Sequence, residues 1–324
     1  MTFHVLVTAR SFANTAGAHQ DYLRENDCAL DLRAPTHPYP ADQLRELIAG
    51  YDGVILGLDA CDASVIERAD RLRAISRYGA GYDAVDLDAA AKKGIVVTNT
   101  PGANRNGVAE LTIALLFSLA RNVPNVVTAA RANRWKREAS WEVAQKTLGI
   151  IGMGAIGRAV AGLALGLNMQ VIAYDPIWQG EMGGVQKSDL AAVLVQSDVI
   201  TLHCALTPET VNLINAATIA QMKDKAYLIN TARGELVDEM ALLEALKSGK
   251  LAGAATDVLR QDPPTDHPLL QLENFLFTPH IGATTHESVQ RMAMLSAQNL
   301  LAVLRGEPCQ YIVNAQLLEA YRHA

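Results

Sequence analysis

The sequence has few cysteines, and their scarcity excludes several kinds of site. Its 324 residues include only four, namely Cys28, Cys61, Cys204 and Cys309. No two of them are close in sequence, so the chain lacks the Cys-x-x-Cys pairs of zinc and redox sites. We therefore expect no bound metal. Isolated cysteines in a chain of this length are typical of free thiols in a reducing compartment.

The sequence also lacks an excess of basic residues. Lysine and arginine number 28 against 34 aspartates and glutamates, which gives a net charge of -6. Binding to the phosphates of nucleic acid requires a basic surface. Nucleic acid is therefore not expected as a partner.

Long apolar runs are missing as well, although half of the residues are hydrophobic. The longest, such as residues 111–120, are well short of the about 20 residues that a membrane-spanning helix needs. The first residues, MTFHVLVTAR, have no basic start followed by an apolar stretch, so they do not resemble a secretory signal. We expect no membrane partner and a cytoplasmic location.

What the sequence does contain is a regular alternation of short apolar runs with amphipathic stretches. Such alternation is typical of parallel βαβ units. In the first hundred residues the expected strands are 3–8, 53–58, 72–76 and 95–98. A second series comprises 147–151, 171–174, 199–202, 226–229, 254–256 and 275–277. Long helices are expected at about 107–121 and 287–305, with a polar excursion at 131–145.

These patterns predict an α/β fold of two Rossmann-like, doubly wound parallel-sheet domains with the cofactor cleft between them. The segment TNTPGANRN, rich in Pro, Gly and Asn, marks the connection near residue 100. Residues 99–285 would form the cofactor-binding Rossmann domain. Residues 1–98 and 286–324 would form a flavodoxin-like, substrate-binding lid domain, so the chain would cross between the domains twice.

The sharpest local signal is the run LGIIGMGAIGRAV, which contains a G-x-G-x-x-G motif between an expected strand and an expected helix. Gly152 permits a tight turn, Gly154 lets backbone N–H groups approach a pyrophosphate, and Gly157 allows helix and strand to pack closely. The helix N-terminus then faces the negative charge. The motif predicts a dinucleotide site, although three glycines at this spacing also occur by chance.

An acidic residue follows at the end of the next expected strand. Asp175 lies 18 residues after Gly157, where a carboxylate that binds a ribose 2′-hydroxyl is expected. A carboxylate there repels a 2′-phosphate, and neither Pro176 nor Ile177 supplies a compensating charge. The position favours NAD over NADP.

Three further motifs come at the ends of later strands, where ligands of open α/β sheets bind. LINTARGELVD carries Arg233, ATDVLRQDPP carries Asp257 and Asp262, and FTPHIGATT carries His280. An arginine presents a planar fork of donors for a carboxylate, and a histidine is suited to transfer protons near neutral pH. The alternatives stay open: a helix cap or surface position for Arg233, a core position for His280 and a turn for Asp262.

At this point the sequence resembles the D-2-hydroxyacid dehydrogenase family, in particular its phosphoglycerate dehydrogenase-like branch. The resemblance covers nearly the whole chain. Beside the motifs above it includes RYGAGYDAVDLDAA, NTPGAN, VAELT and LHCALTPET. It implies an NAD-dependent oxidoreductase that transfers a hydride between the cofactor and a small D-2-hydroxy or 2-keto acid.

The resemblance also implies roles for the catalytic residues. Arg233 would hold the carboxylate and carbonyl of the keto acid, and His280 would exchange a proton with the substrate oxygen. Asp262 would support His280, at a position where the family usually has the longer glutamate. Asp257 would contact the carboxamide of the nicotinamide.

The binding residues follow from the same resemblance. The expected cofactor-binding set is Gly152, Gly154, Ala155, Ile156, Gly157, Asp175, Cys204, Thr231, Ala232, Asp257 and Gly282. The backbone of Ala80 and Gly81 would hold the substrate carboxylate. His203, which also matches the family, is expected to pack a loop near the cofactor.

The sequence indicates less about the chemical group that the substrate carries beyond its 2-keto acid end. Phosphoglycerate dehydrogenases hold a distal phosphate with arginines, and here Gly57 stands at one such position while Arg77 and Arg137 match two others. A second anionic group on the substrate is therefore expected, with solvated surface positions as the alternative for both arginines. Reduction of glyoxylate or hydroxypyruvate is the alternative within enzymes, and an NAD-sensing binding protein or corepressor is the alternative outside them.

The resemblance finally implies a homodimer. The excursion around Trp135 would reach the partner subunit.

Overall fold

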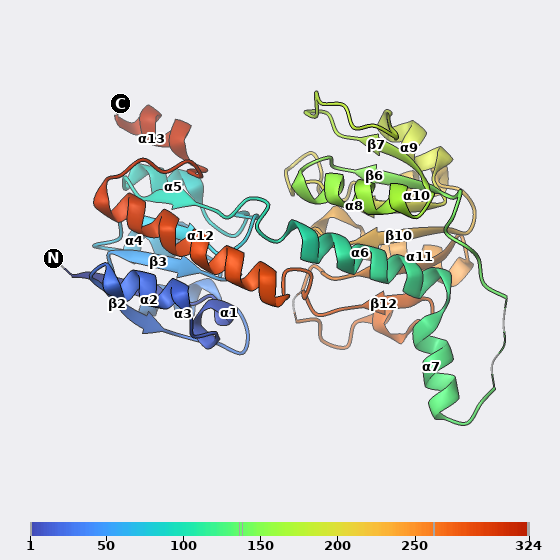
Figure 1. Ribbon diagram of the computed structural model, residues 1–324, viewed down its shortest axis with the longest axis horizontal. Coiled ribbons are helices and arrows are strands. Elements are labelled where there is room, and N and C mark those ends of the chain that lie inside the picture. Colours follow the sequence, from blue (N-terminus) through green and yellow to red (C-terminus); the bar gives the residue numbers. More distant parts are fainter. Residues whose placement is uncertain (1, 136, 138, 262, 323–324) are drawn as a thin grey trace. The chain divides into compact units, whose positions relative to one another are not determined.

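The structure is a computed structural model that describes residues 2–135, 137, 139–261 and 263–322. Two compact units divide the chain: unit 1 comprises residues 1–104 and 283–324, and unit 2 comprises residues 105–282. Each unit contains one parallel sheet with helices on both faces (Figure 1). The expected α/β class with two Rossmann-like parallel sheets is thus confirmed.

Unit 1 has a five-stranded sheet in the order β2-β1-β3-β4-β5. Its strands are β1 (Phe3–Val7), β2 (Cys28–Leu32), β3 (Gly53–Leu56), β4 (Ala74–Arg77) and β5 (Val96–Thr98). Its helices are α1 (Arg10–Asn14), α2 (Ala18–Glu25), α3 (Ala41–Leu47), α4 (Ala63–Arg68), α5 (Leu87–Lys92), α12 (His286–Arg305) and α13 (Ala315–Arg322).

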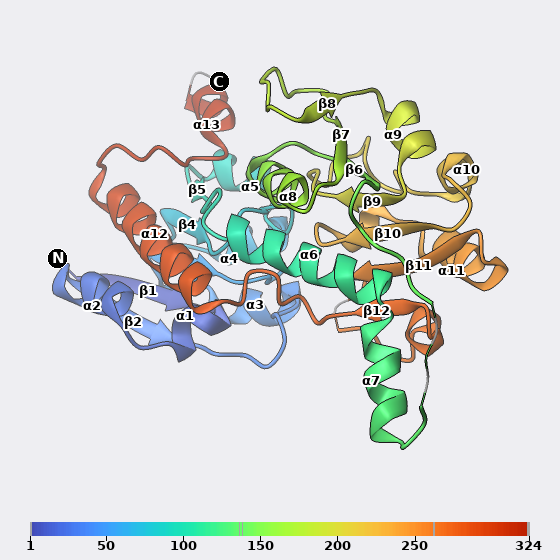
Figure 2. The same ribbon diagram turned by 45° about the vertical axis from the view of Figure 1, so that its right-hand side comes forward.

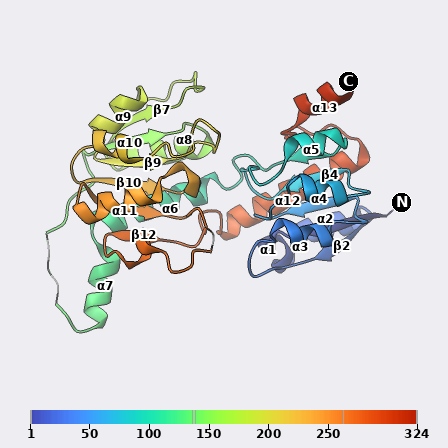
Figure 3. The ribbon, with the colours of Figure 1, turned by 180° about the vertical axis from the view of Figure 1, so that it is seen from behind.

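The inner strands β1 and β3 of unit 1 read as largely apolar runs because both faces of the sheet are buried. Val5 and Val7 pack in the cluster that contains Leu300 and Leu304 of α12. Leu6, between them, packs in the opposite cluster. Figures 1 and 3 show the two faces, with α2 and α12 over one and α3, α4 and α5 over the other.

Unit 2 has a seven-stranded sheet in the order β12-β11-β10-β9-β6-β7-β8. Its strands are β6 (Thr147–Ile151), β7 (Gln170–Tyr174), β8 (Val185–Lys187), β9 (Val199–Leu202), β10 (Ala226–Asn230), β11 (Leu251–Thr256) and β12 (Phe275–Phe277). Its helices are α6 (Arg105–Ala120), α7 (Val123–Arg131), α8 (Ala155–Gly166), α9 (Leu190–Gln196), α10 (Ala216–Gln221) and α11 (Glu239–Ser248), with short 3-10 turns η1 (Gly234–Leu236) and η2 (Pro268–Gln271).

The sheet of unit 2 is also covered on both faces. Helices α6 and α8 pack over one face, and α9, α10 and α11 lie over the other (Figure 2). Helix α7 has no counterpart among the expected helices, and it projects away from these layers. Its Pro124 lies in the first turn, where a missing N–H breaks no helical hydrogen bond.

None of the described helices is long and apolar enough to cross a membrane alone. Only α6 and α7 taken together reach the length and hydropathy of a span, and they meet at a bend of 63°.

Candidate active site

The chain order of unit 2 changes direction between β6 and β9. Strands β7 and β8 extend the sheet on one side of β6, and β9 to β12 extend it on the other. In open α/β sheets such a switch point creates a crevice at the carboxyl ends of the strands. The predicted residues Gly152, Asp175, Cys204, Arg233 and His280 all follow strands of this sheet at that edge.

The turn after β6 requires glycine for steric reasons. Gly152 has φ +100°, and a Cβ there would lie 2.4 Å from the backbone nitrogen of Cys204. A Cβ on Gly157 would lie 2.0 Å from the carbonyl oxygen of Gly152. These two glycines therefore allow β6, α8 and the segment after β9 to pack against one another.

Gly154 differs from the other two glycines because the space beside it is open. A Cβ built on Gly154 meets no atom within 4 Å. The residue is the N-cap of the twelve-residue helix α8, and Ala155 and Ile156 begin that helix. The first N–H groups of a helix have no partner within it and attract anions. This open cradle at a helix N-terminus fits the pyrophosphate of a dinucleotide.

Asp175 connects the end of β7 to the glycine turn. Its Oδ2 accepts a hydrogen bond from the amide of Met153 at 2.7 Å, and its Oδ1 accepts from Ile177 at 2.9 Å and Trp178 at 3.1 Å. A carboxylate offers about four acceptor sites, so one remains for a ribose hydroxyl. The structure thus places the acid beside the turn, as expected for an NAD site.

The segment after β9 contributes two buried titratable side chains. Burial raises the pKa of the Cys204 thiol to about 11, so the thiol stays protonated at neutral pH. Burial lowers the pKa of His203 to about 3, so its imidazole is neutral. The Nε2 of His203 lies 2.9 Å from the Oγ1 of Thr201. The backbones of both residues lie next to Gly152, and both side chains are uncharged at neutral pH.

The loop after β10 carries Thr231, Ala232 and Arg233, and Asn230 shapes it. The Nδ2 of Asn230 donates to the carbonyl of Arg233 at 2.7 Å, while its Oδ1 accepts from the amide of Ala232 at 3.0 Å. The hydroxyl of Thr231 lies 3.1 Å from that of Thr112 on α6. The Nη1 of Arg233 donates to the carbonyl of Ala232 at 2.7 Å.

Asp257, at the end of β11, organises the turn that carries His280. Its carboxylate accepts hydrogen bonds from the Thr278 hydroxyl at 2.6 Å, the Ile281 amide at 2.9 Å and the Gly282 amide at 2.8 Å. Burial raises the pKa of Asp257, although these donors oppose the rise. His280 has φ +52°, in the left-handed region. The three donors flank His280 on both sides and so stabilise this turn.

The predicted substrate residues Ala80 and Gly81 follow β4 in unit 1. Among the described residues, none accepts a hydrogen bond from either amide. The neighbouring turn is fixed, because the carbonyl of Ala80 accepts from Asn99 at 2.7 Å and the amide of Gly79 donates to Thr100 at 3.0 Å. Two free N–H donors on a fixed turn suit a carboxylate.

The predicted arginines have different environments. Arg77 is 4% exposed, and its Nη1 donates to the carbonyls of Tyr78 at 2.5 Å and Leu56 at 3.3 Å. Arg137 is exposed. Asp262 lies outside the described residues, so its partnership with His280 stays a prediction.

Some residues of this edge escape prediction from sequence. Asn230 is 1% exposed and holds the Arg233 loop through both ends of its amide, yet its only signal is a polar residue at the end of an apolar strand. Gly234 is equally required, since a Cβ there would lie 2.2 Å from the carbonyl carbon of Leu259. In the described part of the chain, no three His, Cys, Asp or Glu side chains gather to hold a metal ion.

Comparison with known proteins gives the family context of this arrangement. The model of the NAD binding domain of D-isomer specific 2-hydroxyacid dehydrogenases matches residues 113–282. This match confirms NAD as the expected cofactor.

Curated relatives and solved structures agree with this match. The D-3-phosphoglycerate dehydrogenase of Archaeoglobus fulgidus is 39% identical over 92% of this chain, but the chain spans only 58% of that protein. The glyoxylate reductase of Korarchaeum cryptofilum is 39% identical over 91% of this chain and 92% of that protein. The crystal structure of the TT0316 protein from Thermus thermophilus is 39% identical, with a TM-score of 0.87 over 96% of this chain and 99% of that chain.

Proposed function

Because the chain belongs to the D-isomer specific 2-hydroxyacid dehydrogenase family, we propose that it transfers a hydride between NAD and a small D-2-hydroxy or 2-keto acid. The observation that carries the proposal is the row of strand ends in unit 2. Strand β10 leads to Arg233, β11 to Asp257 and β12 to His280, at the same edge of the sheet as the glycine turn after β6. One edge of the sheet thus carries an arginine that can bind a carboxylate, a histidine that can transfer a proton and a glycine turn that can bind a dinucleotide.

In the proposed chemistry His280 transfers a proton and Arg233 binds the substrate through its positive charge. When bound, NADH supplies a hydride to the carbonyl carbon of the keto acid. Arg233 binds the substrate carboxylate with its planar donors, and the imidazolium of His280 donates a proton to the carbonyl oxygen. In the oxidative direction, neutral His280 takes the proton from the hydroxyl group. Asp262 is assigned the role of supporting the imidazolium with its negative charge.

The turn after β4 in unit 1 is a second candidate for binding a substrate carboxylate. The free amides of Ala80 and Gly81 support this role. Arg77 and Arg137 remain candidates for a second anionic group, as in a 3-phosphoglycerate-like substrate.

One observation favours smaller acids such as glyoxylate or hydroxypyruvate. Strand β3 ends next to Gly57, at a position where the phosphoglycerate branch is expected to have an arginine. The carboxylate of Asp59 is 1% exposed there and accepts hydrogen bonds from the Thr8 hydroxyl at 2.5 Å, the Tyr39 amide at 2.8 Å and the Gly57 amide at 3.0 Å. A fixed negative charge at this edge opposes a second anion on the substrate.

The test is NADH oxidation by the purified protein with glyoxylate, hydroxypyruvate, 3-phosphohydroxypyruvate and 3-sulfopyruvate. We expect turnover with at least one acid, and a preference for the two uncharged at the distal end. Faster turnover with the phosphorylated acid would show instead that the enzyme binds a second anionic group, for which Arg77 and Arg137 are separate candidates. NADH binding without turnover of any acid would support the NAD-sensing protein and contradict the enzyme.

The variant His280→Gln tests the mechanism. We expect its kcat to fall by at least about 100-fold, the usual contribution of a general acid. Its Kd for NADH, measured by fluorescence, should not change because the glycine turn and Asp175 are intact. Unchanged kcat would remove His280 from the proton transfer.

The proposal also includes the oligomeric state of the protein and its location in the cell. We place the protein in the cytoplasm because its four cysteines are free thiols. We assign it a homodimer in which α7 and the following excursion contact the partner. Val123, Val126 and Val127 on α7 are 45%, 37% and 41% exposed, and Trp135 is 81% exposed. Apolar side chains gathered on one projecting segment are typical of a protein interface.

A further inference from the structure

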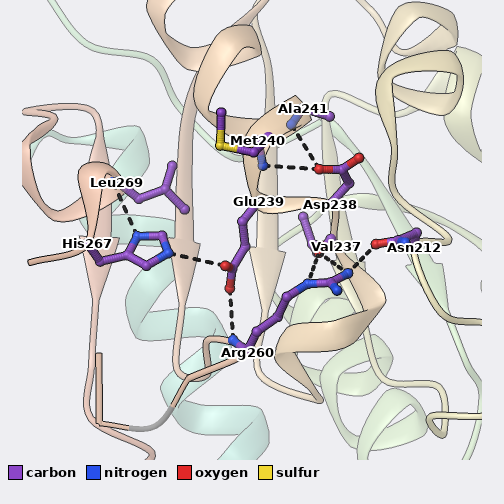
Figure 4. Close-up of polar contacts among 9 residues, drawn as sticks. All are labelled: Asn212, Val237, Asp238, Glu239, Met240, Ala241, Arg260, His267 and Leu269. Carbon is purple, nitrogen blue, oxygen red and sulfur yellow. Dashed lines mark hydrogen bonds and ion pairs between the residues drawn. The ribbon is translucent and has the colours of Figure 1, made fainter. Parts of the chain in front are cut away.

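A polar cluster at the start of α11 joins two segments that are far apart in sequence (Figure 4). Glu239, the first residue of α11, accepts a hydrogen bond from the amide of Arg260 through its Oε1 at 2.8 Å. Its Oε2 lies 3.1 Å from the Nε2 of His267. The side chains of Glu239 and His267 are only 17% and 16% exposed. One largely buried carboxylate therefore holds both ends of the segment 260–267.

The hydrogen-bond pattern fixes the direction of these contacts. The Nδ1 of His267 accepts a hydrogen bond from the amide of Leu269 at 3.3 Å. The hydrogen of a neutral imidazole is then on Nε2, which donates to Glu239. Hydrogen bonds to a carboxylate are charge-assisted and stronger than those between neutral groups. Both anchors of the segment depend on the charge of Glu239.

The side chain of Arg260 forms further hydrogen bonds that hold the same segment. Its Nε and Nη2 donate to the carbonyl of Val237 at 3.3 Å and 3.1 Å, and Nη2 also donates to the carbonyl of Glu235 at 3.3 Å. The Oδ1 of Asn212 accepts a further hydrogen bond from Nη2. Glu235 and Val237 lie just after Arg233 in the chain, so the cluster ties the segment to the loop of the substrate-binding arginine.

The backbones of the two segments are also in direct contact. A Cβ on Gly234 would lie 2.2 Å from the carbonyl carbon of Leu259 and 2.4 Å from the nitrogen of Arg260. The residue after Arg233 thus packs directly on the start of the segment. A displacement of the segment 260–267 would break the contact with Gly234 and the hydrogen bonds of Arg260.

We propose that Glu239 is a positioning residue for the reaction, because it holds the segment that carries Asp262 against the loop that carries Arg233. The inference rests on the proposed function, in which Asp262 supports His280. Asp262 is one methylene group shorter than the glutamate usual in the family, so its side chain has less reach to compensate for a displaced backbone. A displacement of about 1 Å costs up to about 100-fold in rate in such constellations.

The test compares three variants at the cluster. Glu239→Ala removes both anchors, Glu239→Gln keeps an oxygen for the Arg260 amide but loses the charge, and His267→Ala removes one anchor. We expect kcat for keto-acid reduction to fall by about 10- to 100-fold in Glu239→Ala and by less in the other two. The Kd for NADH should not change, because the glycine turn lies at a different strand end. Should Glu239→Ala not fold, Glu239→Gln and His267→Ala carry the same test.

A matched control is available on the same helix. Glu244 forms an exposed ion pair with Lys247 at 3.8 Å, and its side chain is 71% exposed. Glu244→Gln should have wild-type kcat and the same pH profile.

The pH profile separates positioning from a loss of stability. A weakened contact of the acid with His280 disfavours the imidazolium, so the alkaline limb of the reduction profile should shift to lower pH in Glu239→Ala. A purely structural defect lowers the rate equally at every pH. A wild-type kcat, or an unshifted profile in Glu239→Ala, would overturn the proposal.

A double-mutant cycle distinguishes this inference from the function on which it rests. If Glu239 acts through Asp262, Glu239→Ala should lower kcat by less than about twofold in a protein that already carries Asp262→Asn. Independent, multiplying effects would overturn the positioning role. A wild-type kcat in Asp262→Asn alone would contradict the role of Asp262 in the proposed function, whatever the result at Glu239.

Discussion

At the scale of single residues, the edge of the unit 2 sheet combines charged ligands with side chains that burial keeps neutral. His203 is the clearest example, because burial lowers its pKa from 6.5 to about 3. Its Nδ1 has no hydrogen-bond partner among the described residues. The free energy of folding therefore depends on pH through this residue.

The sign of this dependence follows from proton uptake. Below about pH 6.5 the unfolded chain protonates His203, whereas the folded chain does so only near pH 3. Stability from this residue is complete above pH 6.5 and is lost as the pH falls, by about 1.4 kcal/mol per pH unit. Urea unfolding at pH 7 and pH 5 measures how far the free energy of unfolding falls between the two pH values. We expect this fall to be smaller by about 2 kcal/mol in His203→Gln than in the wild type. Equal losses in the two proteins would contradict the burial of a neutral imidazole.

Residues with a local signal were the ones that sequence analysis could find. Gly152, Gly154 and Asp175 belong to a motif with fixed spacing, and the structure places them at one turn. The contacts of Glu239 with Arg260 and His267 join positions 21 and 28 residues apart. No spacing rule connects such positions, because the fold of the intervening chain decides which of them meet.

At the scale of elements, the turn between β6 and α8 assigns different tasks to its glycines. Gly152 serves the packing of the turn, and Gly154 leaves space for a ligand. Substitution by alanine should therefore separate stability from cofactor binding.

Gly154→Ala should fold normally, since φ is -66° and the added methyl meets no atom within 4 Å. We expect its unfolding free energy to change by less than about 0.5 kcal/mol and its Kd for NADH to rise at least about tenfold. Gly152→Ala should instead lose at least about 1–3 kcal/mol of stability, because backbone strain adds to the clash of its Cβ with the backbone of Cys204. Calorimetry and NADH titration measure both effects; a destabilised Gly154→Ala with normal NADH affinity would reverse the assignment.

The strands that were predicted read as largely apolar runs, and the two that were missed, β2 and β8, do not. Strand β2 reads CALDL and is only partly buried, and β8 has three residues, two of them exposed. Helix α7 was missed because a proline soon after an apolar helix is typical of a helix end, whereas Pro124 lies in the first turn of α7. Edge strands and projecting helices bury too little apolar surface to leave a periodic pattern.

At the scale of the whole molecule, α7 determines the proposed assembly. Replacing Val126 and Val127 by glutamate should convert a dimer of 34.8 kDa chains into monomers, because charged side chains on an interface lose their hydration on association. Sedimentation velocity measures the mass. As a control, Val195→Glu on α9, where the valine is 54% exposed, should remain dimeric. A monomeric wild type would contradict the proposed dimer.

The discontinuity of unit 1 has a consequence for synthesis on the ribosome. Helix α12 supplies Leu300, Leu301 and Leu304 to the core beside β1 and β3, yet it is made only after all of unit 2. About 180 further residues are made between the sheet of unit 1 and the helix that covers this face. Their synthesis takes roughly 10 to 40 s at 5–20 residues per second. During that interval the sheet's exposed valines and leucines are a natural target for chaperones, whereas unit 2 is made without interruption and has its complete sequence once residue 282 has been added.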